Sequence, residues 1–264
     1  MRYLSLVWNV GVRKIKKKME IKKYLITAYL LLVIPSVSSA AIGTSTVSVF
    51  NPTGSSFTQA YTVSSVNSAL IIGARPYASS GNGDFWTGLS YAGTSMTKLG
   101  WFGSGCNPND SYYLWGVINP SIGSNNIVGT SSVSYDGGFN FFVTEYTGVN
   151  SFGATSTAIS CNSSGISTRI TTQSSNSWVV GTTGSSGGGG SAGSNTMARP
   201  TAINPWLIES TSNPIATPSS VSLAWSGAST NPAWDIGINI VSLQPTEEPT
   251  ASPTRRIKGM GASR

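Results

Sequence analysis

The stretch from residue 112 to residue 132 constrains the fold more than any other part of the chain. Its apolar side chains alternate between the two faces of an extended strand, with Tyr112, Leu114 and Ile118 on one face and Tyr113, Trp115 and Val117 on the other. Asn119-Pro120 and Gly123 then predict a turn, because proline lacks a ladder donor and Asn and Gly tolerate turn dihedrals. Ile127-Val128 restarts the extended chain. A strand that is apolar on both faces belongs in the middle of a layered β structure.

Further segments have the alternating or continuously apolar pattern of strands. They are residues 44–50, 57–61, 69–75, 85–91, 97–102, 139–146, 167–172, 178–183, 221–226 and 234–243. No segment has helical periodicity, and the sequence shows no internal repeat of roughly 20–50 residues. We therefore expect an all-β protein, a two-sheet antiparallel sandwich of roughly 10–12 strands.

Two connections between these segments carry predictions of their own. Residues 85–91 and 97–102 are expected to pair with each other across the short connection 92–96. Residues 185–195 consist of Gly, Ser, Ala and Asn, which is a flexible composition. Only about fifty residues separate this segment from the proline-rich tail, too few for a second sandwich. We therefore interpret it as a long mobile loop within one domain rather than as an interdomain linker.

The beginning of the chain has the composition of a secretory leader. A basic run from Lys14 to Lys23 precedes an apolar segment, 24–35, of about a dozen residues, which is shorter than the ~20 needed to span a membrane. Small residues follow. This order predicts a signal peptide over residues 1–40, cleaved after Ala40 or Ala41, with an uncleaved anchor as the alternative.

The domain organisation follows from the two ends. A single sandwich domain is expected over residues 41–244, and residues 245–264, in which prolines alternate with Thr and Ser, are expected to form a tail or stalk. Met19 is an alternative to Met1 as the start. We expect a secreted or cell-surface protein with no membrane span after removal of the leader.

Charge outside the leader is low and balanced. Eight of the sixteen Lys and Arg residues lie in residues 1–40, and residues 41–264 carry eight bases and eight acids. Charged residues make up 9% of the chain, against ~25% in typical globular domains. Ser, Thr, Asn and Gly take the polar positions instead. No basic patch is present that would predict a nucleic-acid partner.

The chain contains two cysteines and no histidine. In an oxidising compartment Cys106 and Cys161 are expected to form one disulfide, with two free thiols as the alternative. Ser-His-Asp and Cys-His catalysis both require an imidazole, and two thiols alone argue against a metal site. Neighbouring Asn and Asp at 82/84 and 109/110 offer too few carboxylates to predict calcium binding. We expect no cofactor.

Paired carboxylates are the remaining route to an enzyme, because two acids ~5–5.5 Å apart are enough to cleave a glycosidic bond. The acids of the expected domain are Asp84, Asp110, Asp136, Glu145, Glu209 and Asp235. Glu145 is the best candidate, but it stands alone in its strand, and its nearest acid in sequence is Asp136. A lone strand glutamate is more often a hydrogen-bonded structural group, so we do not expect an enzyme.

The segment 101–110 has the ingredients of a sugar-binding loop. The candidate ligand-binding residues are Trp101, Phe102, Asn107, Asn109 and Asp110. Aromatic faces stack on the C–H surfaces of sugars, while Asn and Asp side chains hold hydroxyl groups. In the alternative interpretation the two rings are core residues at a strand end, and the three polar residues only form turns.

Several short motifs resemble a known family. They are Leu-Ile-Ile-Gly at 70–73, Tyr-Ala-Gly-Thr-Ser-Met-Thr-Lys-Leu at 91–99, Tyr-Leu-Trp-Gly-Val-Ile-Asn-Pro at 113–120, Thr-Glu-Tyr-Thr-Gly-Val at 144–149 and Trp-Asp-Ile-Gly-Ile-Asn-Ile-Val-Ser-Leu-Gln-Pro at the end of the domain. Over about residues 44–245 the chain resembles the concanavalin A-like jelly-roll domains of secreted bacterial surface proteins and phage structural proteins. The resemblance implies a jelly-roll fold and a non-catalytic binding or display role, and it implies no particular binding residues.

The leader, the low charge, the aromatic-rich strands and the missing catalytic groups favour one function above the others. We expect a secreted, non-enzymatic module that binds a glycan or another cell-surface component through its loops. A structural subunit of a fibre, surface layer or virion is the second hypothesis, since uncharged Ser/Thr/Asn-rich strand faces suit lateral packing, and it would imply a homo-oligomer. A polysaccharide-cleaving enzyme is the third.

Overall fold

The computed structural model describes most of the expected domain. The described residues are 42–44, 47–76, 83–103, 111–133, 139–161, 163–187, 189–199, 201, 203–226 and 235–245. They belong to one compact unit. The predicted signal peptide, and the predicted tail after Pro245, lie outside them. In the part of the chain that is described, no helix has the length and apolar character needed to cross a membrane.

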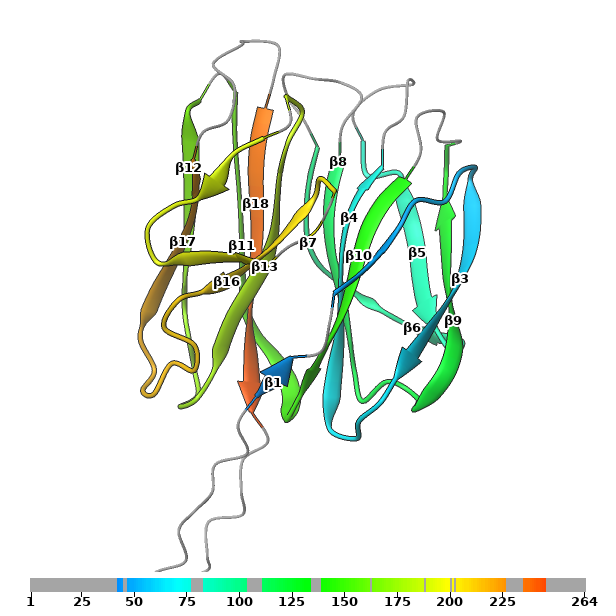
Figure 1. Cartoon of the computed structure of the whole chain (residues 1–264), viewed down its shortest axis with the longest axis horizontal. Coiled ribbons are helices and arrows are strands. Elements are labelled where there is room, and N and C mark those ends of the chain that lie inside the picture. The colour runs from blue at the N-terminus through cyan, green and yellow to red at the C-terminus, as the bar shows by residue number, and fades with distance from the viewer. Residues whose placement is uncertain are drawn as a thin grey trace, which may run out of the picture. The chain divides into compact units, whose positions relative to one another are not determined.

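The described strands form four antiparallel sheets (Figure 1). The first inner sheet contains β1 (Gly43–Thr44), β2 (Ser48–Phe50), β10 (Phe139–Thr147), β4 (Ser68–Pro76), β8 (Ser111–Ile118) and β7 (Thr97–Gly103). The first outer sheet contains β3 (Ser56–Val63), β9 (Gly123–Ser131), β5 (Trp86–Tyr91) and β6 (Thr94–Ser95). The second inner sheet contains β11 (Val149–Cys161), β18 (Asp235–Pro245), β13 (Trp178–Ser185), β16 (Trp206–Ser210) and β15 (Thr196–Arg199). The second outer sheet contains β12 (Gly165–Thr171), β17 (Ser220–Ser226) and β14 (Ser191–Ala192).

Three buried clusters fill the spaces between the four sheets. Between the first outer and first inner sheets the cluster is rich in aromatic rings, including Trp86, Tyr113 and Trp115. Between the second inner and second outer sheets it is mainly aliphatic, with residues such as Ile238 and Leu223. The cluster between the two inner sheets joins the halves of the molecule. Each inner sheet is therefore covered on both faces.

The predicted all-β antiparallel sandwich is confirmed, but it has more layers than expected. Four sheets and eighteen strands are found among the described residues, where two sheets and roughly 10–12 strands were predicted. The central strand is confirmed, since β8 is buried along nearly its whole length with a sheet on either side. Asn119 and Gly123, both with positive φ, form the predicted turn into β9.

The two halves of the described chain have the same strand order. The inner sheet runs β2-β10-β4-β8-β7 in the first half and β11-β18-β13-β16-β15 in the second. The outer sheets correspond as well, as β3-β9-β5 and β12-β17-β14. Only the short β1 and β6 of the first half have no counterpart. The sequence shows no short repeat, whereas the structure repeats one arrangement over roughly half of its length.

Two of the predicted connections differ from the structure. The segments around β5 and β7 do not pair with each other: β5 pairs with β6 and β9, whereas β7 pairs with β8 in another sheet. The segment predicted as a mobile loop, 185–195, contains β14, which pairs with the end of β17. Position 190 requires glycine, because a Cβ there would lie 2.2 Å from Nε1 of Trp225.

The longest strands that were not predicted are β11 and β16. The sequence of β11 is mostly small and polar, Val-Asn-Ser-Phe-Gly-Ala-Thr-Ser-Thr-Ala-Ile-Ser-Cys, and much of it is exposed. An edge strand of this kind is held by its ladder with β18 rather than by apolar alternation. In β16 the apolar run Trp-Leu-Ile is too short to stand out from its surroundings.

Candidate functional site

Trp101 lies on β7, the edge strand of the first inner sheet, and 36% of its surface is exposed. The other large apolar side chains exposed in the described ranges are aliphatic or Met, which makes Trp101 the one aromatic among them. Its ring centroid lies 6.4 Å from that of Tyr113 on the adjacent β8. An exposed indole that rests on a buried ring is a preformed flat surface for a ligand.

Phe102 points to the opposite face of β7 and is not part of the candidate site. Only 3% of its surface is exposed, and its ring stacks on Tyr112 at 4.7 Å between centroids. Gly237 of the second inner sheet lies against the same ring, where a Cβ would come within 1.9 Å of it. The ring is therefore core, as the alternative interpretation of the sequence proposed, because neighbouring residues of a strand face opposite sides.

The other predicted residues of the site cannot be placed. Asn107, Asn109 and Asp110 lie outside the described residues, and so does Cys106. Cys161 is the last residue of β11. The disulfide between the two cysteines and the roles of the three polar residues stay predictions.

A β-bulge brings Lys98 and Trp101 onto the same face of β7. Residues three apart in a regular strand point to opposite faces. The pairing of β7 with β8 shifts between Lys98 and Gly100, so that the strand has one extra residue there. Leu99 and Gly100 consequently both face the second inner sheet, the first in the cluster between the inner sheets and the second against Asn239. The bulge thus assembles a site from two side chains that would otherwise be separated.

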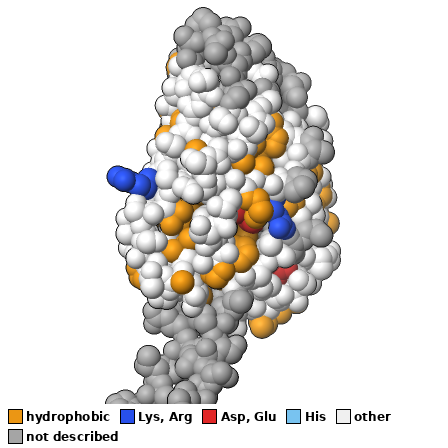
Figure 2. Space-filling view, turned by 60° about the vertical axis from the view of Figure 1, so that its left-hand side comes forward, with side chains coloured by type: hydrophobic (Ala, Val, Ile, Leu, Met, Phe, Trp, Pro, Cys, Tyr) orange, Lys and Arg blue, Asp and Glu red, His pale blue; other side chains and the backbone are white. Residues whose placement is uncertain are grey.

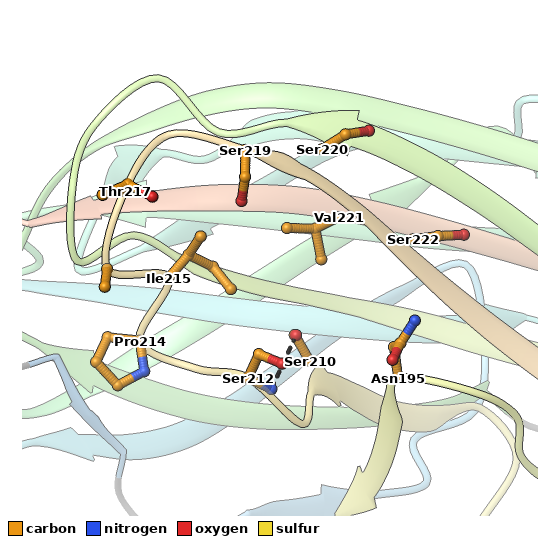
Figure 3. A pocket seen from close by; sticks show the side chains of 11 residues that line it. Asn195, Ser210, Ser212, Pro214, Ile215, Thr217, Ser219, Ser220, Val221 and Ser222 are labelled. Atoms are coloured by element: carbon orange, nitrogen blue, oxygen red, sulfur yellow. Dashed lines mark hydrogen bonds between the residues drawn. The ribbon is translucent and has the colours of Figure 1, made fainter.

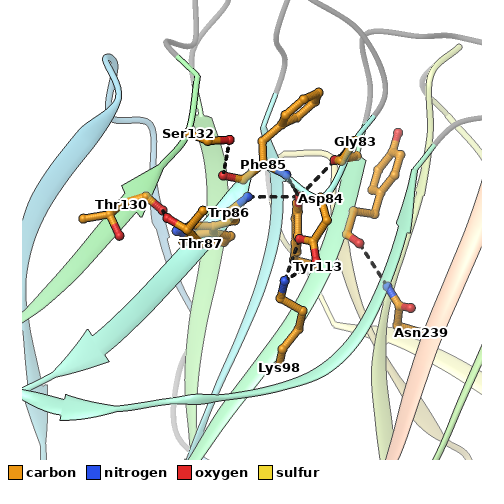
Figure 4. A network of polar contacts seen from close by, with 12 residues as sticks. Gly83, Asp84, Phe85, Trp86, Thr87, Lys98, Tyr113, Thr130, Ser132 and Asn239 are labelled. Carbon is orange, nitrogen blue, oxygen red and sulfur yellow. Dashed lines mark hydrogen bonds and ion pairs between the residues drawn. The ribbon is translucent and has the colours of Figure 1, made fainter.

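Lys98 forms an ion pair beside Trp101. Its Nζ lies 2.5 Å and 2.6 Å from the two carboxylate oxygens of Asp84 (Figure 4). The same Nζ lies 5.1 Å from the ring centroid of Trp115 and 5.5 Å from that of Tyr113, within cation–π range. The side chains of Lys98 and Asp84 are 28% and 45% exposed, so both are accessible to a ligand.

The hydroxyl group of Tyr113 fixes the segment that carries Asp84. It accepts hydrogen bonds from the backbone N–H groups of Phe85 at 2.9 Å and Trp86 at 3.3 Å, and it donates to the carbonyl of Gly83 at 3.3 Å (Figure 4). Ser111 Oγ donates to the same carbonyl at 3.0 Å. Asp84 is therefore held between anchored neighbours, on the connection that enters β5.

A pocket of about 320 Å³ lies next to Trp115, near the connection between β5 of the first outer sheet and β7 of the first inner sheet. We call it the edge pocket. It is lined by Thr87, Gly88, Leu89, Ser90, Ser95, Met96, Trp115, Val128 and Thr130. Within the described part of the chain, Nε1 of Trp115 has no hydrogen-bond partner. The edge pocket is thus lined by hydroxyl and apolar groups, and it shares Trp115 with the ion pair.

Glu145, the best candidate acid from the sequence, is buried and hydrogen-bonded. Its side chain is 1% exposed and accepts hydrogen bonds from Ser64 N at 3.0 Å, Ser64 Oγ at 2.8 Å and Ser65 N at 2.9 Å. These donors belong to the connection between β3 and β4. A carboxylate held by three donors anchors that connection, as expected for a buried polar group.

The described residues hold no cluster of three or more Asp, Glu, Cys or His side chains suited to a metal ion. Asp84, which the sequence placed beside a weak calcium pattern, is instead paired with Lys98. Asn82, Asn109 and Asp110, the other residues of these weak calcium patterns, lie outside the described residues.

Sequence reasoning identified Trp101 but missed Lys98, Asp84 and Trp115 as its neighbours. One signal pointed to Lys98, because it is the single lysine between residues 41 and 244. Nothing in the sequence announces the bulge that places it beside Trp101. Comparison with family models, with curated proteins and with solved structures finds no match for this chain.

Proposed function

We propose that this protein is a non-enzymatic, secreted or cell-surface module that binds a glycan at the edge of the first inner sheet. The observation that carries the proposal is Trp101, an exposed indole beside the Lys98–Asp84 ion pair. The indole face stacks on a sugar ring, and the ion pair offers both hydrogen-bond donors and acceptors to sugar hydroxyls. Trp101 and Lys98 lie on a strand, and Asp84 lies on a connection anchored by Tyr113, which keeps these groups in fixed positions.

The charge of the site indicates which glycans it favours. Lys98 and Asp84 neutralise each other, so the site offers no net positive charge to a polyanion. The edge pocket next to them is lined by hydroxyl and apolar groups. A neutral oligosaccharide, which presents C–H faces and hydroxyls, is the ligand that these groups complement.

The strand order supports a jelly-roll assignment, with one roll in each half where the family resemblance implied a single roll. In each half, the chain passes repeatedly between an inner and an outer sheet, and a strand near its beginning, β2 or β11, pairs with the last, β10 or β18. Two interleaved Greek keys of this kind make a jelly roll. We therefore assign a jelly roll to each half. The hydrogen-bonded state of Glu145 supports a binding role rather than a catalytic one.

A glycan array followed by calorimetric titration with the bound oligosaccharide tests this function. Trp101→Ala is expected to weaken binding by about tenfold or more, because aromatic anchors dominate such interfaces. Met197→Ala is the matched control: Met197 is 43% exposed on β15, in the other half, and its removal should leave affinity unchanged. A folded wild type that binds no glycan, or a Trp101→Ala variant that binds as well as wild type, would contradict the proposal.

A structural subunit is the second candidate function, and the repeated strand order favours it. A chain whose two halves share one strand order offers an assembly two similar frameworks for contacts in each chain. Figure 2, which brings the side of β12 and β17 forward, shows mainly uncharged polar surface between scattered apolar side chains. Such a surface suits lateral packing. Ordered assemblies in negative-stain images and a concentration-dependent sedimentation coefficient are expected if this function is correct, and a monomer at all concentrations would exclude it.

A further inference from the structure

Among the described residues, one edge of the central strand of the second outer sheet, β17, is largely unpaired. On one side, β12 pairs with β17 along its whole length, from Ser220 to Ser226. On the other side, β14 reaches only Trp225 and Ser226. No described strand pairs with residues 220–223 on that side.

The pattern of hydrogen bonds shows which backbone groups face this open edge. On the β14 side, the N–H of Gly193 donates to the carbonyl of Ala224 at 2.9 Å, and Thr196 Oγ1 accepts from the N–H of Ala224 at 2.7 Å. In an antiparallel ladder, alternate residues direct both backbone groups to the same side. The N–H and C=O groups of Ser222 and Ser220 therefore point toward the open edge. An unpaired row of this kind is a template for another strand.

A groove of about 410 Å³ runs along this edge (Figure 3). Ser220 and Ser222 of β17 form one wall, and Asn195, Ser212 and Pro214 lie across from them. Ile215 and Val221, which are 5% and 7% exposed, contribute apolar surface. None of the residues that line the groove is charged. The groove therefore matches an extended, uncharged chain that presents hydroxyl and apolar side chains.

The first half of the molecule shows what fills the corresponding place. There, β9 occupies the position of β17, and its second neighbour is β5, a strand of six residues that pairs with it antiparallel from Ser131 to Ile127. The counterpart of β5 in the second half is β14, with only two residues. Because the two halves share one strand order, the space beside β17 corresponds to the part of β5 that has no counterpart in the shorter β14.

We propose that the open edge of β17 binds an extended, uncharged peptide segment of a partner protein by β-strand addition. The segment runs antiparallel to β17 and exchanges backbone hydrogen bonds with Ser220 and Ser222. Its alternate side chains rest against Ile215 and Val221. This site lies in the half that does not carry Trp101, and it is independent of the proposed glycan site.

The probe for this site is a fluorescein-labelled peptide with the sequence of residues 85–92, Phe-Trp-Thr-Gly-Leu-Ser-Tyr-Ala, which is uncharged and copies the strand from the first half. Saturable fluorescence polarisation is expected with the wild-type protein. Ser222→Pro should weaken binding by about tenfold or more, because proline removes the N–H that faces the groove but not the ladder with β12. Ser222→Ala keeps the N–H and should bind as wild type does. A peptide with proline at alternate positions should not bind.

Amide hydrogen exchange gives a readout that does not depend on the variants folding. On addition of the peptide, the amide of Ser222 should become protected, whereas those of Val221 and Leu223, which face β12, should not change. Absence of saturable binding, binding that Ser222→Pro leaves intact, or equal protection of Ser222 and its neighbours would overturn the proposal. Protection of Ser222 that rises with protein concentration alone, together with dimers in sedimentation, would replace the peptide partner by a second copy of this chain.

Discussion

The first half of the molecule, from β1 to β10, and the second half, from β11 to β18, share one strand order. They differ in the side chains that pack between their sheets. The first half packs aromatic rings between its sheets, with Trp86 in T-shaped contacts with Tyr113 and Trp115 at 5.5 Å and 5.7 Å. The second half packs mainly Ile, Val and Leu. One architecture is thus compatible with two kinds of core, provided that each fills its space.

The halves also differ at their corresponding edges. In the first half, β7 presents Lys98 and Trp101 to solvent beside the open edge pocket. The counterpart of β7 is β15, where the residue opposite Ile208, on the face toward the second outer sheet, is Ala198. The charged and aromatic groups of the candidate site therefore belong to one half alone. The repeat supplies the frame, and the binding chemistry comes from substitutions on one copy of it.

A third region, between the two inner sheets, is unlike either core. At Gly184 and Gly237 the sheets approach so closely that a Cβ would lie 1.9 Å from the rings of Tyr112 and Phe102. Buried polar contacts join the halves across this region: Tyr146 Oη donates to Glu209 Oε1 at 2.6 Å, and Asn239 Nδ2 donates to the carbonyl of Tyr112 at 3.4 Å. Close approach and specific hydrogen bonds thus fix how one half sits on the other.

The largest effect on stability is expected from Trp86→Ala. Trp86 is 1% exposed at the centre of the aromatic cluster, so its removal leaves a large cavity and should lower the free energy of unfolding by about 3–5 kcal/mol. Urea denaturation measures the change. Trp206→Ala is the comparison in the second half, where the ring is only partly buried against Trp225, and its cost should be clearly smaller. Equal losses would show that the two cores do not differ in the way described.

Gly237→Ala is expected to loosen the contact between the halves. The new methyl group would meet the ring of Phe102, which is itself stacked on Tyr112, so the two inner sheets must separate. Overpacking of this kind should cost about 1–3 kcal/mol of unfolding free energy. Gly88→Ala is the control, since its nearest neighbour is Thr130 Oγ1 at 3.1 Å in the first outer sheet. A Gly237→Ala variant as stable as wild type would show that the close approach is not needed.

Tyr146→Phe tests the polar link between the halves and its pH dependence. Burial, and then the charge and hydrogen bond of Glu209, raise the pKa of Tyr146 well above its usual value. The folded protein therefore holds this proton more tightly than the unfolded chain, so the stabilisation is complete below the unfolded pKa of about 10 and declines as the pH rises beyond it.

Loss of the donor to buried Glu209 should cost about 1–3 kcal/mol at neutral pH. The decline of stability above pH ~10 should be less steep in Tyr146→Phe than in wild type. Urea denaturation at a series of pH values measures both effects. An unchanged pH profile in the variant would show that Tyr146 does not link folding to proton binding.

The smallest effect on stability is expected from Trp101→Ala. The indole is 36% exposed and rests against Tyr113, so its removal should lower the free energy of unfolding by about 1 kcal/mol. Thermal unfolding measures this, and it separates the variant's expected loss of glycan binding from any loss of folding. A large drop in stability would instead assign Trp101 to the core of the first half.

Most of the local structure could be predicted from the sequence. The segments 69–75, 139–146 and 221–226 lie in β4, β10 and β17, and the described part of 234–243 lies in β18, because buried strands are continuously apolar or alternate. β11 could not be predicted because its hydrogen-bonded pairing with β18, rather than a pattern in its own side chains, stabilises it as a strand. Of the candidate site, Trp101 could be predicted and Lys98 could not, since a bulge rather than regular spacing places these two side chains on one face of β7.

By itself the sequence determined the all-β class and the doubly covered central strand, because alternation of apolar side chains is a local property. The tertiary structure decided that there are four sheets rather than two, that one strand order occurs twice, and that Lys98 joins Trp101. These features depend on which strands pair, and pairing brings together residues far apart in the chain. Backbone hydrogen bonds are the same for every pair of strands, so only the packing of whole sheets against one another selects among the pairings.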